Sequence, residues 1–151
     1  MSLPRAVGLG FVVLLVAACN YVVTGPPSPT PADFPGIAIE FQKRGLHVGD
    51  PVAGDAGCDD PVLAPTAISF DVSGKDQATP VKMYLYVFRN KATYERLRST
   101  IDACARTYVT DAATFESVEE SPFVLAGQGP WAPEFKTIIR TALESAAGTG
   151  G

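Results

Sequence analysis

The chain has 151 residues, of which 46% are apolar and 19% charged, a composition typical of one domain with a single hydrophobic core. Sixteen acidic residues outnumber twelve basic ones, which gives a formal net charge of −4. This balance argues against a nucleic-acid partner, because phosphate binding relies on clustered lysines and arginines and the sequence has no such cluster.

The first 19 residues have the order of features found in exported proteins. Arg5 precedes an apolar run from Ala6 to Val16, and the small residues Ala17 and Ala18 stand directly before Cys19. This order is typical of a secretory signal, and the run is shorter than the roughly 20 apolar residues that span a bilayer. Together, Val16-Ala17-Ala18-Cys19 resembles the lipobox of bacterial lipoproteins.

That resemblance implies that residues 1–18 are a removed signal peptide and that Cys19 carries a diacylglycerol on its thiol. It also implies an extracytoplasmic protein that is anchored by lipid to the bacterial cell membrane. The alternatives are an ordinary signal followed by a chance cysteine, or an uncleaved N-terminal anchor. Cleavage would remove only Arg5 among the charged residues, so the mature chain would carry a formal charge of −5.

Residues 19–33 are predicted to be a tether between the lipid and the domain. Four prolines within this stretch favour an extended, polyproline-like chain, at positions Pro26, Pro27, Pro29 and Pro31. At about 3.1 Å per residue, such a chain would hold the domain roughly 30 to 40 Å from the lipid surface. A proline-rich ligand for another domain is the alternative.

The domain is expected to begin with a helix over residues 34–44. Asp33 can cap it, Pro35 falls in its first turn, and Gly45 can end it. A brief strand over residues 46–48 should follow. Apolar and polar residues alternate over residues 66–72, and residues 81–88 are largely apolar on both faces, so we predict a hairpin of two strands there.

The second half of the chain adds two helices and one strand. A helix over residues 91–108 has one apolar stripe that includes Cys104. Residues 109–121 give a weak pattern, with a helical turn after Asp111 and an extended stretch before Pro122. A short buried strand over residues 123–126 and a helix from about Pro133 complete the predicted elements.

Cys58 and Cys104 remain as one pair once Cys19 is assigned to lipid. We predict a disulfide bond between them, because disulfides persist in extracytoplasmic compartments. Closing this loop would stabilise the fold by roughly 4 kcal/mol in the chain-entropy model. Two separately buried thiols are the alternative.

The stretch from Asp50 to Asp60 is rich in carboxylates, which include Asp55 and Asp59. Clustered carboxylates suit a hard cation such as Ca²⁺, but their spacing fits no calcium-loop pattern. We favour a solvated loop held by Cys58 and keep metal binding as the alternative. His47, the only histidine, has no neighbouring pattern that indicates a catalytic base or a metal ligand.

Tyr84, Tyr86 and Trp131 form the candidate binding surface. The tyrosines lie on one face of the strand at residues 81–88, and aromatic area exposed on a sheet can bind a partner. Trp131 ends a turn in which Gly127 and Gly129 could allow the backbone to approach a ligand. The alternative, which we favour for this turn, is that the glycines serve its geometry and Trp131 covers the core.

These elements predict an α+β fold for residues 34–147, followed by a frayed tail at residues 148–151. We expect a mostly antiparallel sheet of about four strands, with about three helices chiefly on one face. The sequence favours a non-enzymatic binding module of the cell envelope that has a protein or other envelope component as its partner. The alternative is a lipoprotein that binds a small ligand or a divalent metal through residues 50–60, and we predict no cofactor and no catalytic residue.

Overall fold

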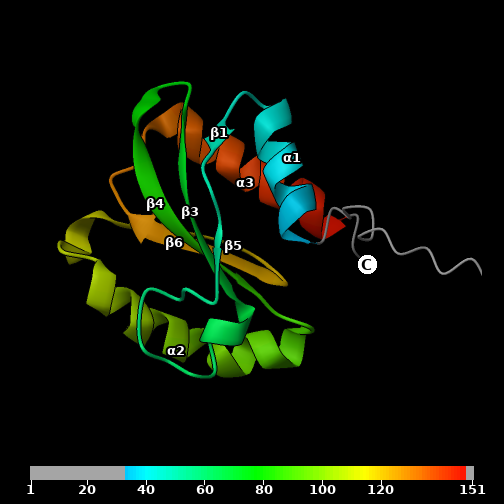
Figure 1. The fold of residues 1–151 in the computed structure, drawn as a ribbon, viewed down its shortest axis with the longest axis vertical. Coiled ribbons are helices and arrows are strands. Elements are labelled where there is room, and N and C mark those ends of the chain that lie inside the picture. The colour runs from blue at the N-terminus through cyan, green and yellow to red at the C-terminus, as the bar shows by residue number, and fades with distance from the viewer. Residues whose placement is uncertain (1–32, 149–151) are drawn as a thin grey trace, which may run out of the picture.

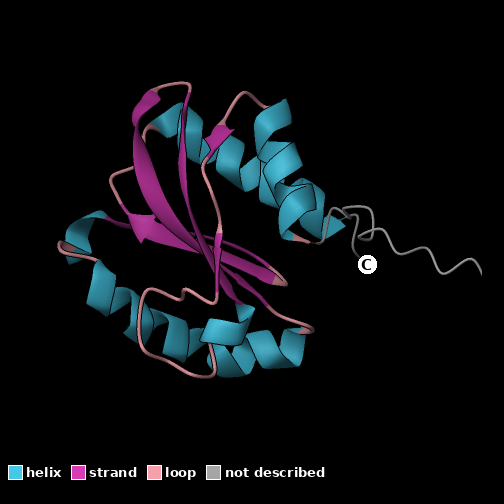
Figure 2. Ribbon diagram, in the orientation of Figure 1, coloured by secondary structure: helices cyan, strands magenta, loops and turns pink. Residues whose placement is uncertain are grey.

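A six-stranded antiparallel sheet runs through the middle of the protein, with helices on both of its faces (Figures 1 and 2). The computed structural model describes residues 33–148. The expected signal peptide, Cys19, nearly all of the tether and residues 149–151 lie outside the described residues. The expected α+β class is confirmed.

The elements occur in an order close to the one predicted. They are α1 (Phe34–Lys43), β1 (His47–Val48), β2 (Val52–Ala53), η1 (Ala64–Thr66), β3 (Ala67–Gly74), β4 (Gln77–Val87), α2 (Lys91–Tyr108), η2 (Ala112–Thr114), β5 (Phe115–Glu120), β6 (Phe123–Gln128) and α3 (Pro133–Gly148). The three expected helices are present. The expected tail begins one residue too early, because Gly148 still belongs to α3.

The sheet has more strands than the expected four. Its order is β1-β3-β4-β6-β5, and β2 also pairs with β3. The two additional strands are β2, which has only two residues, and β5, whose sequence carries three glutamates and resembles a loop. Both are edge strands, where burial is incomplete and the hydrophobic pattern is weak.

Two of the three helices share one face of the sheet, as expected, but the other face is not open. Helices α1 and α3 pack on one face of the sheet, and α2 covers the other (Figure 1). The physical reason lies in β4, whose neighbouring residues Met83, Tyr84, Leu85 and Tyr86 are all buried. A strand that is apolar on both sides must be covered on both sides.

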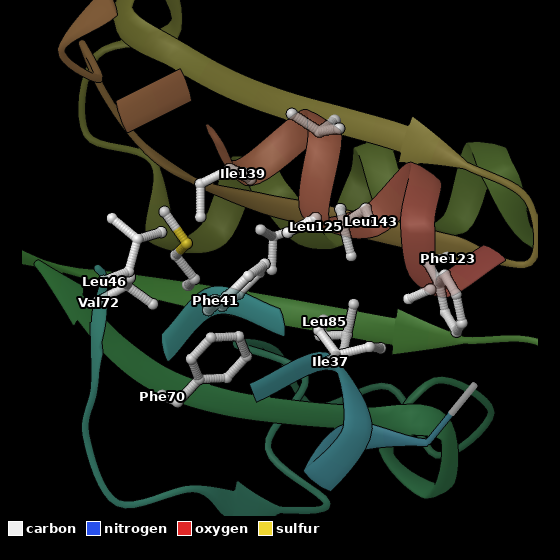
Figure 3. Close-up of a cluster of buried hydrophobic side chains, with 14 of the residues drawn as sticks. Ile37, Phe41, Leu46, Phe70, Val72, Leu85, Phe123, Leu125, Ile139 and Leu143 are labelled. Carbon is white, nitrogen blue, oxygen red and sulfur yellow. The ribbon is translucent and has the colours of Figure 1, made fainter. Parts of the chain in front are cut away.

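Two hydrophobic clusters result, one on each side of the sheet. The cluster under α1 and α3 is the larger, and Figure 3 shows Phe41, Phe70 and Leu85 within it. The cluster under α2 contains Tyr86 and Ile101.

Side-chain caps fix where the helices begin. Asp33 accepts a hydrogen bond from the Gly36 N–H at 2.8 Å, and Asn90 accepts one from the Thr93 N–H at 2.9 Å. The first turn of α3 is capped from the β3–β4 hairpin, since the Asp76 carboxylate accepts from the N–H groups of Glu134 and Phe135. Among the described helices, none combines the length and apolar character needed to cross a bilayer.

Candidate functional site

The structure does not bring Tyr84, Tyr86 and Trp131 together on an exposed surface, so this part of the sequence prediction is wrong. Their exposed fractions are 9%, 0% and 4%, respectively. The two tyrosines lie under α2, whereas Trp131 belongs to the cluster under α1 and α3, on the opposite face of the sheet. The face that was expected to be open is covered by α2 and by the segment that carries Ala56 and Leu63.

Trp131 packs on the core, which is the interpretation that we favoured for its turn. Its indole N–H donates to the Gln128 carbonyl at 3.2 Å, and its ring meets Phe135 edge to face. The glycines serve backbone packing. A Cβ at Gly127 would lie 2.7 Å from the Lys82 carbonyl oxygen, and one at Gly129 would collide with the Thr114 carbonyl oxygen.

The predicted disulfide bond between Cys58 and Cys104 is present, with Cα atoms 5.4 Å apart. It joins the Asp-rich segment to α2, and the buried Tyr86 hydroxyl donates to the Ala56 carbonyl beside it at 2.8 Å. Burial raises the pKa of Tyr86 far above its usual value. Burial also raises the pKa of Tyr108 to about 12, so both phenols stay neutral at physiological pH.

The carboxylates of the Asp-rich segment mainly fix its backbone. Asp55 accepts hydrogen bonds from the Ser69 hydroxyl at 2.6 Å and from the Gly57 N–H at 2.9 Å. Burial opposes ionisation of Asp55, but these hydrogen bonds and the charge of Lys82 outweigh it, so its pKa is lowered. Asp60 accepts from the N–H groups of Val62 and Leu63, at 2.8 and 2.9 Å.

Within residues 33–148, no three histidine, cysteine, aspartate or glutamate side chains are grouped as metal ligands. His47 is exposed on β1. The Asp-rich segment instead lines an open hollow of about 790 Å³, together with Tyr84 and Thr107. The small-ligand alternative would place its ligand in this hollow, which Tyr84 borders.

A different surface, the outer edge of β5, has features that the sequence analysis did not identify. We call it the β5 edge and define it by residues 115–120. Strand β5 ends the sheet order and pairs only with β6, in a register that places Val118 opposite Leu125. The opposite edge of the sheet is different, because β1 and β2 divide it into two strands of two residues each.

Side chains on the β5 edge alternate between the two helical layers. Glu116 and Glu120 form ion pairs with Lys136 and Arg140 of α3, the second pair at 3.6 Å. Glu119 lies on the other side.

On the α2 side of β5, Glu119 pairs with Arg98 and accepts a hydrogen bond from the Tyr94 hydroxyl at 2.7 Å. The hydrogen bond from Arg98 lowers the pKa of Glu119, burial opposes this effect, and the Tyr94 bond adds to it. The strand is thus held at a fixed position between α2 and α3.

One contact shows which residues of β5 form backbone hydrogen bonds with β6. The Gly129 N–H donates to the Thr114 carbonyl at 2.7 Å, which places Thr114 among the residues that bond to the β6 side. Because these residues alternate along an antiparallel strand, Glu116, Val118 and Glu120 also bond to β6. The N–H and C=O groups of Ser117 and Glu119 therefore point away from the sheet.

Beside Phe115, at the start of β5, lies a hollow of about 580 Å³. Its walls include Val109 and Ala112 between α2 and β5, and the end of α2 contributes Ala105 and Arg106. The β5 edge thus combines outward backbone groups with a mainly apolar hollow on its α2 side. The extended stretch predicted before Pro122 was the one signal in the sequence for this edge.

Comparison with known proteins identifies no family, since no family model, no curated protein and no solved structure matches this chain.

Proposed function

We propose that the protein is a lipid-anchored, extracytoplasmic binding module of the bacterial cell envelope, with no enzymatic role, and that the β5 edge is its binding surface. The observation that carries the binding role is that the backbone N–H and C=O groups of Ser117 and Glu119 point away from the sheet along β5. Native sheets usually protect such edges by shortening them, covering them or adding charges that repel a further strand. Here the glutamates of β5 are ion-paired with the helices and leave the backbone open.

The N-terminal sequence and the disulfide bond support the proposed location. A charged residue, an apolar run, two small residues and Cys19 form the lipobox-like order. Cys58 and Cys104 are joined, and such bonds persist in oxidising compartments outside the cytoplasm. A diacylglycerol on Cys19 would hold the domain far more firmly than a single acyl chain, because each buried CH₂ contributes about 0.8 kcal/mol.

Fractionation of cells that express the Cys19→Ala variant tests the anchor. We expect the variant to leave the membrane fraction, because it cannot be acylated. Cys58→Ser serves as the control for loss of a cysteine, and it should remain in the membrane fraction. Undiminished membrane association of Cys19→Ala would contradict the anchor.

Site-specific crosslinking in intact cells tests the binding surface. A photo-reactive residue at Ser117 should crosslink to a protein or other envelope component, because its backbone lies at the open edge. The same residue at Thr137, exposed on α3, is the control and should give no equivalent product. Equal labelling from both positions, or none from Ser117, would remove the β5 edge as the binding surface.

A further inference from the structure

We infer that the open hollow beside the Asp-rich segment is a second binding site, and that it takes a small, neutral polyhydroxyl ligand such as a mono- or disaccharide. Its basis is the unpaired hydroxyl of a buried tyrosine at a hollow lined by spare hydrogen-bond acceptors. Strand β6 lies between β4 and β5 in the sheet, so this site is separate from the β5 edge. The inference goes beyond the proposed function, and either one can fail its test without the other.

Tyr84 supplies the observation that points to a ligand. It is 9% exposed, and among residues 33–148 its hydroxyl has no hydrogen-bond partner. In the same part of the chain, every fully buried polar side-chain atom does have a partner, so the Tyr84 hydroxyl reaches solvent, and Tyr84 lines the hollow. Tyr86 on the same strand differs, because its hydroxyl donates to the Ala56 carbonyl. Polar groups at such depth are normally paired, so the Tyr84 hydroxyl is left for a molecule that enters the hollow.

Tyr84 contributes a neutral hydroxyl to the site. Burial raises the pKa of Tyr84, and the negative charges of Asp55 and Asp71 raise it further. A neutral phenol donates one hydrogen bond and also accepts. The hollow therefore offers one free hydroxyl donor.

The other side chains of the hollow offer mainly acceptors. One oxygen of Asp55 accepts from the Gly57 N–H and the other from the Ser69 hydroxyl, but a carboxylate can accept about four bonds. Thr107 donates its O–H to backbone carbonyls and keeps oxygen lone pairs for a ligand. Asp59 is exposed, and no described residue pairs with its carboxylate. A ligand must therefore bring several donors and at least one acceptor.

Hydroxyl groups meet this requirement best. An ammonium group only donates, so it would leave the Tyr84 hydrogen unpaired, whereas a carboxylate or phosphate only accepts and would be repelled by Asp55 and Asp59. The Lys82 ammonium lies 3.7 Å from the Asp55 carboxylate, and Asp59 is exposed to solvent, where a single charge is screened. Adjacent hydroxyls of a neutral polyol can accept from Tyr84 and donate to Asp55 or Thr107.

The hollow has the size and the rigid wall that such a ligand needs. Its volume of about 790 Å³ lies within the range usual for small-molecule sites. Gly54 leaves space open, since a Cβ there would meet nothing within 4 Å. Gly57 has a φ of +76°, and a Cβ there would collide with the rings of Tyr84 and Tyr108, so both rings pack against its backbone. The disulfide bond of Cys58 joins this wall to α2.

The test uses the mature chain from residue 19 with Cys19→Ser, which avoids detergent, and a panel of neutral mono- and disaccharides. Binding is followed by amide NMR. At least one sugar should shift the signals of Gly54, Gly57 and Thr107 in a saturable way, while those of Ser117 and Glu119 stay in place. No shift with any sugar of the panel would overturn the inference.

Chemical controls test the need for hydroxyl groups. The bound sugar with every hydroxyl methylated keeps its ring but loses its donors, and the corresponding uronic acid adds a negative charge. Both should bind at least about tenfold more weakly. Cyclohexylammonium tests a simple cation of similar size. Equal binding of the methylated sugar or of the uronic acid, or tighter binding of cyclohexylammonium, would reject a neutral polyol as the ligand.

Tyr84→Phe separates ligand binding from stability. Because the Tyr84 hydroxyl has no partner in the described chain, its loss should leave the urea midpoint unchanged but weaken sugar binding about fivefold, as expected for one hydrogen bond. Tyr94→Phe is the matched control, since its hydroxyl bonds to Glu119 outside the hollow, and it should bind the sugar normally. Unchanged sugar affinity in Tyr84→Phe would overturn the inference, and a lowered midpoint beside it would give that hydroxyl a structural role alone.

Discussion

Tyr86 joins the sheet to the Asp-rich segment on the α2 side of the molecule. Its ring is fully buried, and its hydroxyl reaches the Ala56 carbonyl at 2.8 Å and the Tyr108 hydroxyl at 3.4 Å. A hydroxyl without a partner at such a depth would be costly, so these contacts satisfy the phenol while they hold the Asp-rich segment in place.

Replacing Tyr86 with phenylalanine should lower the free energy of unfolding by about 1–3 kcal/mol. The change removes only the hydroxyl and leaves the Ala56 carbonyl buried without that donor. Urea denaturation measures the effect. Tyr94→Phe is the matched control, because the Tyr94 hydroxyl bonds to an exposed glutamate, and its loss should cost under about 1 kcal/mol. Equal losses in the two variants would contradict the assigned role of Tyr86.

Tyrosine ionisation should also limit stability at high pH. Burial raises the pKa of Tyr108 to about 12, whereas a tyrosine in the unfolded chain ionises near pH 10. Between these values the unfolded state has released the proton and the folded state has kept it, so stability falls as pH rises. Below pH 10 both states are protonated, and this group has no effect.

Urea midpoints measured from pH 9 to pH 12 would show this decline. The double variant Tyr86→Phe, Tyr108→Phe should decline less steeply, since neither ring can ionise. Identical slopes in the wild type and the double variant would show that these two tyrosines do not cause the alkaline loss of stability.

At the scale of elements, glycines at the end of β6 and in the turn that follows it allow β4 and β5 to pack closely against this part of the chain. Gly129 lies beside the Thr114 carbonyl and Glu116, and Gly127 lies beside Lys82 of β4. A side chain at either position would push β5 or β4 away from β6. The glycines therefore serve packing within the sheet.

Gly129→Ala should destabilise the protein by about 1–3 kcal/mol, the usual cost of forcing extra atoms into a packed region. Gly148→Ala is the control, because nothing lies within 4 Å of a Cβ there and alanine favours a helix. Thermal denaturation should separate the two variants clearly. A neutral Gly129→Ala would show that β5 can move away from the turn without cost.

At the scale of the whole molecule, the disulfide bond reinforces only one of the two hydrophobic clusters. Cys58 and Cys104 both belong to the cluster under α2. In the described part of the chain, the cluster under α1 and α3 contains no disulfide and depends on packing.

Reduction should lower the free energy of unfolding by roughly 4 kcal/mol in the chain-entropy model. Guanidinium denaturation with and without a phosphine reductant measures the difference. The double variant Cys58→Ser, Cys104→Ser should show the lower stability from the start and no response to the reductant. A response that persists in this variant would point to an effect of the reductant outside this bond.

The sequence predicted most of the elements but not what covers the second face of the sheet. The apolar stripes of α1, α2 and α3 could be predicted because they depend on local spacing. The disulfide bond could be predicted because only two cysteines remain once Cys19 is assigned to lipid. Tyr84 and Tyr86 were predicted to lie on an open face of the sheet. The alternation of residues in a strand shows which face a side chain is on, but it does not show which elements pack on that face. The cover comes from α2 and from Leu63, distant in sequence.

The candidate site was missed for a related reason. Strand β5 carries Glu116, Glu119 and Glu120, which lower its strand propensity and hide its alternation. The cations that pair with these glutamates, Lys136, Arg140 and Arg98, lie on two helices. The ion pairs that offset the negative charge of β5 therefore form only in the folded chain. Which side of a strand stays open depends on pairing across the sheet.

The first and last helices of the described chain complete one core together. Ile37 and Phe41 of α1 are buried in the same cluster as Ile139 and Leu143 of α3 (Figure 3). Arg44 also donates a hydrogen bond to the Ser145 hydroxyl at 2.9 Å. Chains are synthesised from the N-terminus, so α1 emerges long before the helix that covers it exists. The apolar face of α1 must therefore stay uncovered until α3 has been made, and this domain cannot finish folding before its last helix has been synthesised.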